Sequence, residues 1–304
     1  MDLYLPVAGI SINLFLVVSV GGLVGFLSGL VGVGGGFLLT PILMMIGVPP
    51  TIAAASGACA LVGTSSSGTS VHFRLGNVDL RLGGILLLGG LAGAAVGVHV
   101  IKLLRALGSA DFVITITYVV MLGSIGAFMF VESLHSLRRG MIGQKPHHPV
   151  QQSTFLGKLP FQMNFPRSNV KHSVFVPFIL CALVGILAAI MGVGGGFIMV
   201  PMMVYLLRMP MHVAVGTDLF QILFTCAGVT LMQAAANHTV DIVLALLVAI
   251  GSTVGAQVGA RLVRLLRGEQ LRIVLASIVL ATAAKMTLGL LVEPASLLAG
   301  LGGN

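Results

Sequence analysis

The sequence predicts an all-α polytopic membrane protein made of two inverted repeats of about five helical elements each, with short or broken helices after two GVGGG motifs. Three observations lead to this fold class. Of the 304 residues, 57% are hydrophobic and 8% are charged, whereas about a quarter of the residues in soluble domains are charged. Apolar runs of about 20 residues, long enough to cross a bilayer, recur along the chain. The motif GVGGGF also occurs twice, at Gly32–Phe37 and Gly192–Phe197.

The apolar runs are predicted to be transmembrane helices. They are unbroken, whereas lipid-facing barrel strands alternate apolar and polar residues, so we expect no membrane strands. Two further spans, which follow the glycine motifs, contain more polar residues. The six apolar runs are Ile10–Val31, Leu80–Ile101, Phe112–Val131, Ser173–Met191, Val240–Ala260 and Leu271–Val292.

A short apolar piece follows each glycine motif, at Phe37–Gly47 and at Phe197–Leu207. Each would be only about 17 Å long as a helix, which is short of the ~30 Å hydrocarbon core. With these pieces counted, each half has five elements, two of the ten being incomplete.

The two halves arise from an internal duplication. A shift of 160 residues superimposes GVGGGFLLTP on GVGGGFIMVP, and a shift of 162 pairs Val78–Leu80 with Val240–Ile242. We therefore predict an N-terminal transmembrane repeat at 1–135, a cytoplasmic basic loop at 136–172 and a C-terminal transmembrane repeat at 173–304. The second shift also pairs the glycine stripes, which we expect to serve helix packing; these are Gly89, Gly93 and Gly97 with Gly251, Gly255 and Gly259.

The positive charges favour inverted halves. With five elements per half, the arginine-rich segment Arg261–Arg272 and the loop 136–172 share one side, and Asn237–Asp241 and both termini lie on the other. With four elements per half, the arginine-rich segment and the loop would lie on different sides of the membrane. Because cytoplasmic segments carry the excess of Lys and Arg, we predict the inverted arrangement, a cytoplasmic central loop and a multi-pass location in the bacterial inner membrane.

The composition also excludes several classes of protein. The net charge of +8 lies mostly in short connections and the central loop, and the chain has no Trp, so we expect no nucleic-acid partner. The cysteines Cys59, Cys181 and Cys226 lie in apolar segments and are odd in number, so no disulfide framework is implied. The pair His147 and His148 lacks further ligands nearby, so we predict no metal site, and no cofactor is expected.

The glycine motifs are the first candidate binding site. Consecutive glycines break a membrane helix, and the amides they expose must be buried in protein or line a wet cavity. A short helix that begins after the break directs its N–H groups and positive dipole end at that cavity, which favours an anion. Interrupted helices at matching positions of two inverted repeats are typical of a transporter's central site. The predicted substrate-binding glycines are Gly34, Gly35, Gly36, Gly194, Gly195 and Gly196.

Close helix packing is the alternative explanation of these glycines, since small residues let membrane helices approach one another. A proline follows each motif, at Pro41 and at Pro201. Because proline suits an early helical turn, we favour the interpretation as a site.

Polar residues in the two following spans extend this site. Thr217, Gln221 and Thr225 recur at every fourth position and share one helical face. We predict that they, together with Ser56 and Thr64 in the first half, bind the substrate through hydroxyl and amide groups. The alternative is hydrogen bonding between helices, worth about 1 kcal/mol or less per pair.

Asp218 is a carboxyl group well inside an apolar span. Ionisable residues in membrane segments are functional candidates by default, so we predict that Asp218 carries a coupling proton. The alternative is a carboxylate held by a nearby helix N-terminus. Lys285 is also a candidate for attracting the anion, but we favour the interpretation that it extends to the membrane interface.

These motifs resemble the TauE/SafE family of sulfite exporters, also described as sulfonate uptake permeases. The resemblance rests on the doubled GVGGGF with its proline, on Gly216–Thr217 before Asp218, and on GNVD at Gly76–Asp79. It covers both halves but not the central loop. The first half reads ASGA where the second reads VGTD, so only the second half offers a carboxylate. The resemblance implies transport of sulfite, sulfonates or related organosulfur anions.

We therefore predict a secondary transporter that moves a small anion across the membrane, coupled to protons. The residues themselves imply only a small anion, and the direction of transport is not encoded in any motif. Two alternatives stay open: a membrane assembly factor or enzyme, and an anion channel. Against an enzyme, the chain lacks HExxH, a GxSxG in a suitable setting and paired carboxylates; against a channel, its polar residues do not suggest a ring-lined pore.

Overall fold

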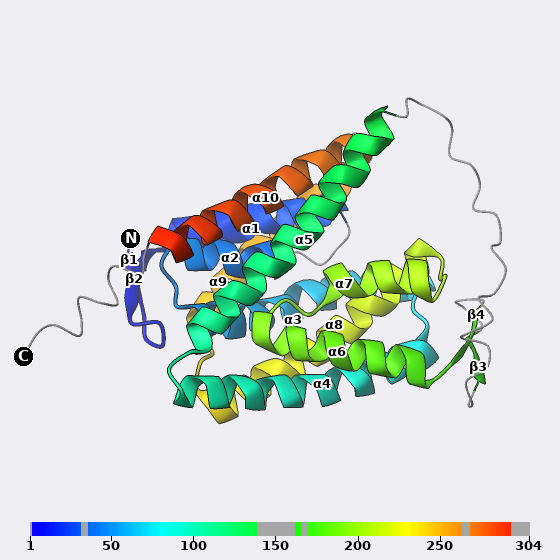
Figure 1. Cartoon of the computed structure of the whole chain (residues 1–304), viewed down its shortest axis with the longest axis horizontal. Coiled ribbons are helices and arrows are strands. Elements are labelled where there is room, and N and C mark those ends of the chain that lie inside the picture. The colour runs from blue at the N-terminus through cyan, green and yellow to red at the C-terminus, as the bar shows by residue number, and fades with distance from the viewer. Residues whose placement is uncertain (1, 32–35, 139–161, 166–169, 263–267, 293–304) are drawn as a thin grey trace, which may run out of the picture.

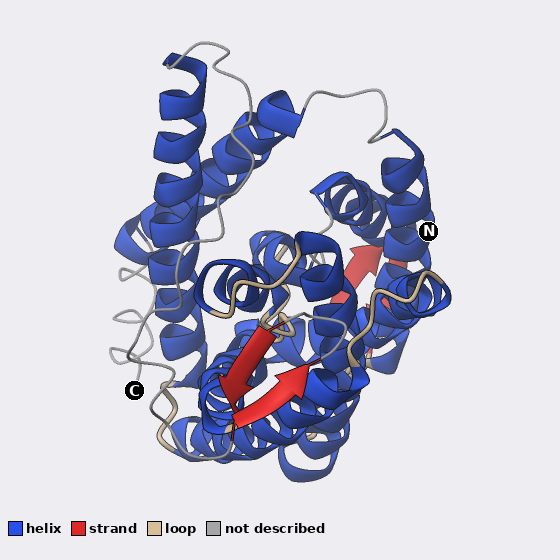
Figure 2. Cartoon of the chain, turned by 90° about the vertical axis from the view of Figure 1, so that its right-hand side faces the viewer, coloured by secondary structure: helices blue, strands red, loops and turns tan. Residues whose placement is uncertain are grey.

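Within the residues that the structure describes, the protein is a bundle of ten α-helices with two short β-hairpins (Figure 1). The computed structural model describes residues 2–31, 36–138, 162–165, 170–262 and 268–292. Figure 2 shows that helices make up most of this chain and that strands are confined to the hairpins. The all-α class predicted from the sequence is confirmed.

Each half follows the order hairpin, long helix, short helix and three long helices. In the first half these are β1 (Asp2–Leu5), β2 (Ile10–Asn13), α1 (Leu14–Val31), α2 (Gly36–Met45), α3 (Pro50–Arg74), α4 (Leu80–Ala106) and α5 (Ala110–Arg138). In the second half they are β3 (Gln162–Phe165), β4 (Val170–Ser173), α6 (Phe175–Met191), α7 (Gly196–Pro201) with the π-helical segment η2 (Met202–Leu206), α8 (Met211–Asn237), α9 (Ile242–Leu262) and α10 (Gly268–Val292).

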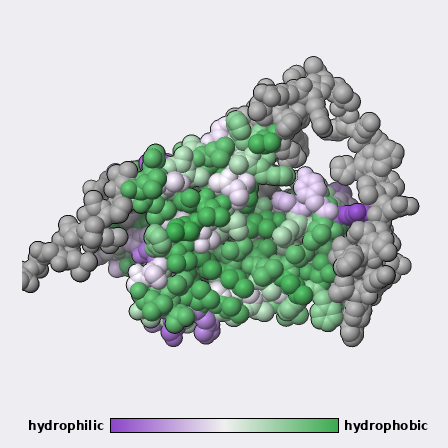
Figure 3. Space-filling view, viewed as in Figure 1, coloured by the Kyte–Doolittle hydropathy of each residue, from purple (hydrophilic) through white to green (hydrophobic). Residues whose placement is uncertain are grey.

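Four helices are long and apolar enough to cross a membrane within the described residues: α4, α5 over Ala110–Phe128, α8, and α9 over Ile242–Gly259. Five further apolar helical segments are shorter, with 10 to 17 residues. They include both segments that follow the glycine motifs, Gly36–Met45 and Gly196–Leu206. The short elements predicted from the sequence are therefore present in both halves. Figure 3 shows that hydrophobic residues cover most of the described surface in that view.

The starts of two predicted spans were wrong. The run from Ile10 begins with strand β2, so the first helix starts only at Leu14. Likewise Ser173 ends strand β4, and α6 starts at Phe175. Apolar composition alone cannot separate a strand from the helix that it leads into.

Sequence signals set the starts of several helices. Asp79 precedes α4 and accepts hydrogen bonds from the amides of Arg81 and Leu82, each at 3.2 Å, which satisfies two amides that the helix cannot pair internally. Asp241 precedes α9 and accepts from the amide of Leu244 at 3.1 Å. Pro50 occupies the first turn of α3, where its missing N–H costs nothing.

Long helices of one half pack against long helices of the other half. Helix α1 of the first half lies along α9 of the second, and α4 of the first lies along α6 of the second. Glycines allow this close approach. A methyl group on Gly25 would lie 2.1 Å from the carbonyl oxygen of Ser252, and one on Gly93 would lie 1.9 Å from that of Ala182.

The glycine stripes predicted to serve packing lie at these two contacts. Methyl groups on Gly89 and Gly97 would lie 2.4 and 2.8 Å from carbonyl oxygens of α6. Those on Gly251 and Gly255 would lie 2.3 and 2.0 Å from carbonyl oxygens of α1. The packing role of these stripes, which requires residues without a side chain at the contact, is thus borne out by the contacts.

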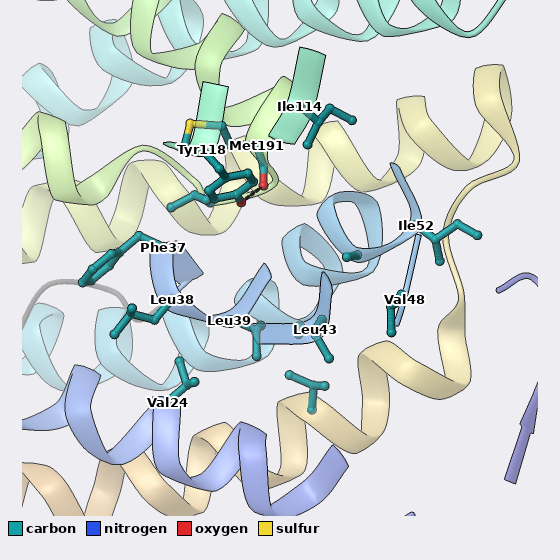
Figure 4. Close-up of a cluster of buried hydrophobic side chains, with 14 of the residues drawn as sticks. Val24, Phe37, Leu38, Leu39, Leu43, Val48, Ile52, Ile114, Tyr118 and Met191 are labelled. Carbon is teal, nitrogen blue, oxygen red and sulfur yellow. Dashed lines mark hydrogen bonds between the residues drawn. The ribbon is translucent and has the colours of Figure 1, made fainter. Parts of the chain in front are cut away.

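The core lies where α2 and α7 meet the long helices. Phe37 and Phe197 follow the two glycine motifs, and their rings stack with centroids 5.7 Å apart. Figure 4 shows Tyr118 of α5 in the same cluster as Phe37, with its hydroxyl directed at the carbonyl of Met191. Tyr118 is fully buried, so this hydrogen bond satisfies its polar end. The cluster therefore contains residues that directly follow the glycine motifs of both halves.

Candidate functional site

The second glycine motif forms a sharp turn between α6 and α7. Gly192, Gly194 and Gly195 have φ angles of 68°, 72° and 79°, in the left-handed region that favours glycine. Gly192 ends α6, and Gly195 precedes the first residue of α7. The sequence therefore breaks the helix here as predicted, and every residue from Gly192 to Phe197 is buried.

Asp218 of α8 lies directly against this turn. A methyl group on Gly196 would lie 2.6 Å from Oδ2 of Asp218 and 2.7 Å from Cδ1 of Ile222. Asp218 is 1% exposed, and its Oδ1 has no hydrogen-bond partner among the described residues. Oδ2 lies beside Gly196, the first residue of α7, so the alternative of a carboxylate near a helix N-terminus stands beside the coupling role. A buried polar group without a partner is costly, so this carboxyl group is available to a proton or a ligand.

Gln221 and Thr225 lie beside Asp218 on α8. The side-chain amide of Gln221 donates to Oγ1 of Thr225 at 2.9 Å, and Oε1 of Gln221 has no partner in the described chain. The glycine at position 90 of α4 makes room for this pair, since a methyl group there would lie 2.8 Å from Thr225 and 2.9 Å from Gln221. These contacts bring two predicted residues to the α4 side of α8.

The first glycine motif is described only from Gly36 onwards, and the predicted residues Gly34 and Gly35 lie outside the described residues. Gly36 begins α2 and is buried; a methyl group on it would lie 2.4 Å from Leu61. Gly57 of α3 approaches Oγ1 of Thr40, which would lie 2.7 Å from an added methyl group. The first half thus offers a hydroxyl group near its break, whereas the second half offers a carboxyl group.

Two predicted site residues bind backbone amides of the opposite half. Oγ1 of Thr217 accepts from the amide of Asp79 at 3.1 Å, and Oγ of Ser56 accepts from the amide of Asp241 at 3.0 Å. All four residues are buried. Each hydroxyl group thereby joins its own half to the start of a helix in the other half. This matches the alternative of hydrogen bonding between helices.

Thr64 makes a local contact, because its hydroxyl donates to the carbonyl of Leu61 on the same helix at 3.2 Å. Of the predicted residues described, Gly194, Gly196 and Asp218 therefore lie at the second break, Gln221 and Thr225 lie on the side of α8 that faces Gly90 of α4, and Ser56 and Thr64 are engaged elsewhere. A methyl group on Gly195 would lie 2.1 Å from Val184.

Other buried polar residues lie outside the set of predicted site residues. Ser65, Thr69 and His72 of α3 each have a buried side-chain atom without a partner in the described chain. Their spacing on one helical face was a visible signal. The buried helix-starting residues Asp79 and Asp241 were also missed, although each is an Asp before an apolar run, which is an N-cap pattern.

The chain matches the family model described as "Sulfite exporter TauE/SafE" over residues 17–286. This range covers both halves and both glycine motifs. The chain belongs to the TauE/SafE family. No matching solved structure was found.

Curated relatives agree with this assignment. The chain is 27% identical over 263 residues to "Probable membrane transporter protein YunE" of Bacillus subtilis, across 82% of this chain and 89% of the relative. It is 26% identical over 279 residues to "Probable membrane transporter protein MJ0441" of Methanocaldococcus jannaschii, across 86% and 91%. A shorter match, 30% over 105 residues, links it to "Sulfite exporter TauE/SafE family protein 3" of Arabidopsis thaliana, across 34% and 22%. The TauE/SafE protein described here is thus a membrane protein of a transporter family.

Proposed function

We propose that this TauE/SafE protein is a secondary transporter that moves a small anion, such as sulfite, a sulfonate or a related organosulfur anion, across the bacterial inner membrane. The substrate class comes from the family description and from the name of one relative. The bound anion would lie between the second glycine break and α8. The substrate-binding groups would be Gly194, Gly196, Gln221 and Thr225.

One observation carries the proposal. The carboxyl group of Asp218 touches the broken helix at Gly196 and is buried, and its Oδ1 has no hydrogen-bond partner within the described residues. An ionised carboxylate there would repel an anion strongly, because charges interact over long distances in an apolar medium. A protonated Asp218 would instead donate a hydrogen bond. Anion and proton would therefore bind together, which is the basis of coupled transport.

The packing of long helices of one half against those of the other supports an inverted repeat as the framework of this transporter. Transporters of this kind hold their substrate near the midplane, where broken helices of two repeats meet. The stacked rings of Phe37 and Phe197 lie at such a meeting point. In this proposal the central loop 136–172 lies in the cytoplasm.

The test is transport into proteoliposomes under an imposed pH gradient, with radiolabelled sulfite as the probe. The wild type should accumulate sulfite above its equilibrium level. Asp218→Asn keeps the shape and a hydrogen-bonding group but cannot release a proton, so downhill exchange should survive and accumulation should stop. Asp111→Asn is the matched control, because Asp111 is an exposed carboxylate at the start of α5 that accepts from the amide of Thr51.

Three outcomes would be informative. Accumulation by Asp218→Asn at the wild-type rate would mean that the coupling proton is carried elsewhere. Equal loss of accumulation in the Asp111→Asn control would point to a general effect of removing a carboxylate. Passive equilibration by the wild type, with no accumulation at any pH gradient, would favour a channel.

A further inference from the structure

The hydroxyl groups of the helices differ in their partners. Eight of them donate to a carbonyl three or four residues earlier on their own helix, as hydroxyl groups in helices commonly do; they belong to Thr64, Thr115, Thr117, Ser124, Thr230, Ser252, Thr282 and Thr287. Ser65 and Thr69 of α3 differ. Ser65 is 1% exposed and Thr69 is 8% exposed, and their oxygen atoms have no partner among the described residues.

His72 continues the same pattern on α3. Its Nδ1 is buried and has no partner in the described part of the chain. Ser65, Thr69 and His72 are separated by four and three positions, so they lie within about 60° of one another around the helix. We call these three residues the α3 polar stripe.

The α3 polar stripe lies close to the candidate site. Nδ1 of His72 lies 3.1 Å from where a methyl group on Gly216 would be, and a methyl group on Gly68 would lie 3.0 Å from Leu219. Gly216 and Leu219 flank Asp218 on α8. His72 and Gly68 of α3 therefore pack against the segment of α8 from Gly216 to Leu219, which contains Asp218.

The end of the stripe is positively charged. Arg74 in the last turn of α3 and Arg81 in the first turn of α4 are both exposed. His212 in the first turn of α8 is also exposed and lies close enough to His72 to interact with it electrostatically. Exposed basic residues of this kind attract anions from solution.

From these observations we infer that the α3 polar stripe is a second binding station for the transported oxyanion, between the site at Asp218 and the membrane face at which Arg74 and Arg81 lie. Two hydroxyl groups and an imidazole can each donate a hydrogen bond to an oxyanion. The absence of a partner for these atoms among the described residues is explained if the ligand is the partner. This inference rests on the proposed anion transport and adds binding residues to it.

The experiment compares sulfite uptake by proteoliposomes containing the wild type and the double variant Ser65→Ala/Thr69→Val. A hydrogen bond to a charged group has a large effect on binding, so the KM for sulfite should rise by about tenfold or more. The melting temperature of the variant without sulfite should stay equal or increase, because two buried unpaired polar groups are removed. Stabilisation of the folded protein by added sulfite should shrink.

The control is Thr117→Val on α5, which removes a hydroxyl group outside the proposed sites. The hydroxyl group of Thr117 already donates to the carbonyl of Val113, so the KM should not change. An unchanged KM in the double variant, with wild-type uptake intact, would overturn the inference and leave water as the partner of these oxygens. A lower melting temperature with an unchanged KM would also overturn it in favour of a structural role. If the wild type shows neither saturable uptake nor stabilisation by sulfite, the proposed function fails, and this inference fails with it.

Discussion

Hydroxyl groups join the two halves of this protein at two equivalent places. Thr217 holds the amide of Asp79 and Ser56 holds the amide of Asp241, at nearly equal distances of 3.1 and 3.0 Å. Both aspartates begin a helix, and Asp241 also accepts from the amide of Val7 in the first hairpin at 3.2 Å. The duplicated sequence thus places the same contact twice, each time between the halves.

The first prediction concerns these contacts. Thr217→Val retains the shape of the side chain but removes the hydroxyl group that accepts from the buried amide of Asp79, so it should destabilise the protein by about 1–3 kcal/mol. Thermal unfolding in detergent measures this. Thr217→Ser, which keeps the hydroxyl group, is the control and should remain close to the wild type. If Thr217→Val unfolds like the wild type yet loses sulfite binding, Thr217 is a ligand contact after all.

A second prediction concerns the close approach of Gly196 to Asp218. Gly196→Ala places a methyl group 2.6 Å from Oδ2 of Asp218, a distance at which one of the two must move. We expect sulfite uptake to fall at least tenfold while much of the protein remains folded, because the displaced group lies at the proposed site. Gly123→Ala on α5 is the control, since a methyl group there meets no atom within 4 Å. Wild-type uptake by Gly196→Ala would remove this turn from the proposed site.

At the residue scale, the sequence indicated which polar residues share a helical face, but not which groups each of them contacts. Thr217, Gln221 and Thr225 were predicted to act together from their spacing, but Thr217 binds a backbone amide of the other half, whereas Gln221 binds Thr225. The spacing shows which residues share a helical face. It cannot show which distant segment packs against that face, because this depends on how the halves associate.

At the scale of elements, the sequence predicted all of the helices but not the first hairpin, β1–β2. The short helices were predictable because the glycines and a following proline mark a break and a new start. The hairpin β3–β4 lies in the segment 136–172, whose apolar stretch LPFQMNFPRS indicates a small hairpin or an interfacial segment. Strand pairing is a non-local property, and a short apolar run is compatible with either structure.

The third prediction concerns helix packing. Gly93 and Gly84 both lie on α4, but only Gly93 contacts α6. Gly93→Ala introduces a methyl group 1.9 Å from the carbonyl oxygen of Ala182, so the two helices must separate. We expect a loss of stability of about 1–3 kcal/mol. Gly84→Ala meets no atom within 4 Å and should be neutral or stabilising, since alanine favours a helix.

Thermal unfolding and the yield of monodisperse protein are the measurements for this pair. Gly255→Ala should behave like Gly93→Ala, because it faces the carbonyl oxygen of Gly22 at 2.0 Å in the equivalent contact of the other half. Equal stability of Gly93→Ala and Gly84→Ala would show that the α4–α6 contact can relax and that the glycine stripe has another role.

At the scale of the whole molecule, the duplication extends further than the helices. In the first hairpin Asp2 pairs with Asn13, and in the second Gln162 pairs with Ser173. Both residues of the second pair follow those of the first by 160 positions, which is the shift that superimposes the two glycine motifs. We therefore propose that the second repeat begins near Gln162 rather than at residue 173, so that each repeat consists of a hairpin and five helices.

The hairpins also provide the test of inversion. Figure 1 shows β1–β2 and β3–β4 at opposite ends of the molecule. If the repeats are inverted across the membrane, the first hairpin lies outside and the second lies in the cytoplasm, on the side of the basic loop. Parallel repeats would instead place both hairpins on one side.

The last prediction follows from this difference. Ser11 of β2 and Met163 of β3 are both exposed, so a cysteine at either position should react with a membrane-impermeant maleimide that reaches it. The background variant replaces Cys59, Cys181 and Cys226, none of which is fully exposed. In intact cells Ser11→Cys should be labelled and Met163→Cys should be labelled only after permeabilisation. The positive-inside distribution gives the same orientation, because the basic residues near Met163 belong in the cytoplasm. Labelling of both cysteines in intact cells, or of neither, would mean that the repeats are parallel and that the short helices do not reverse the chain.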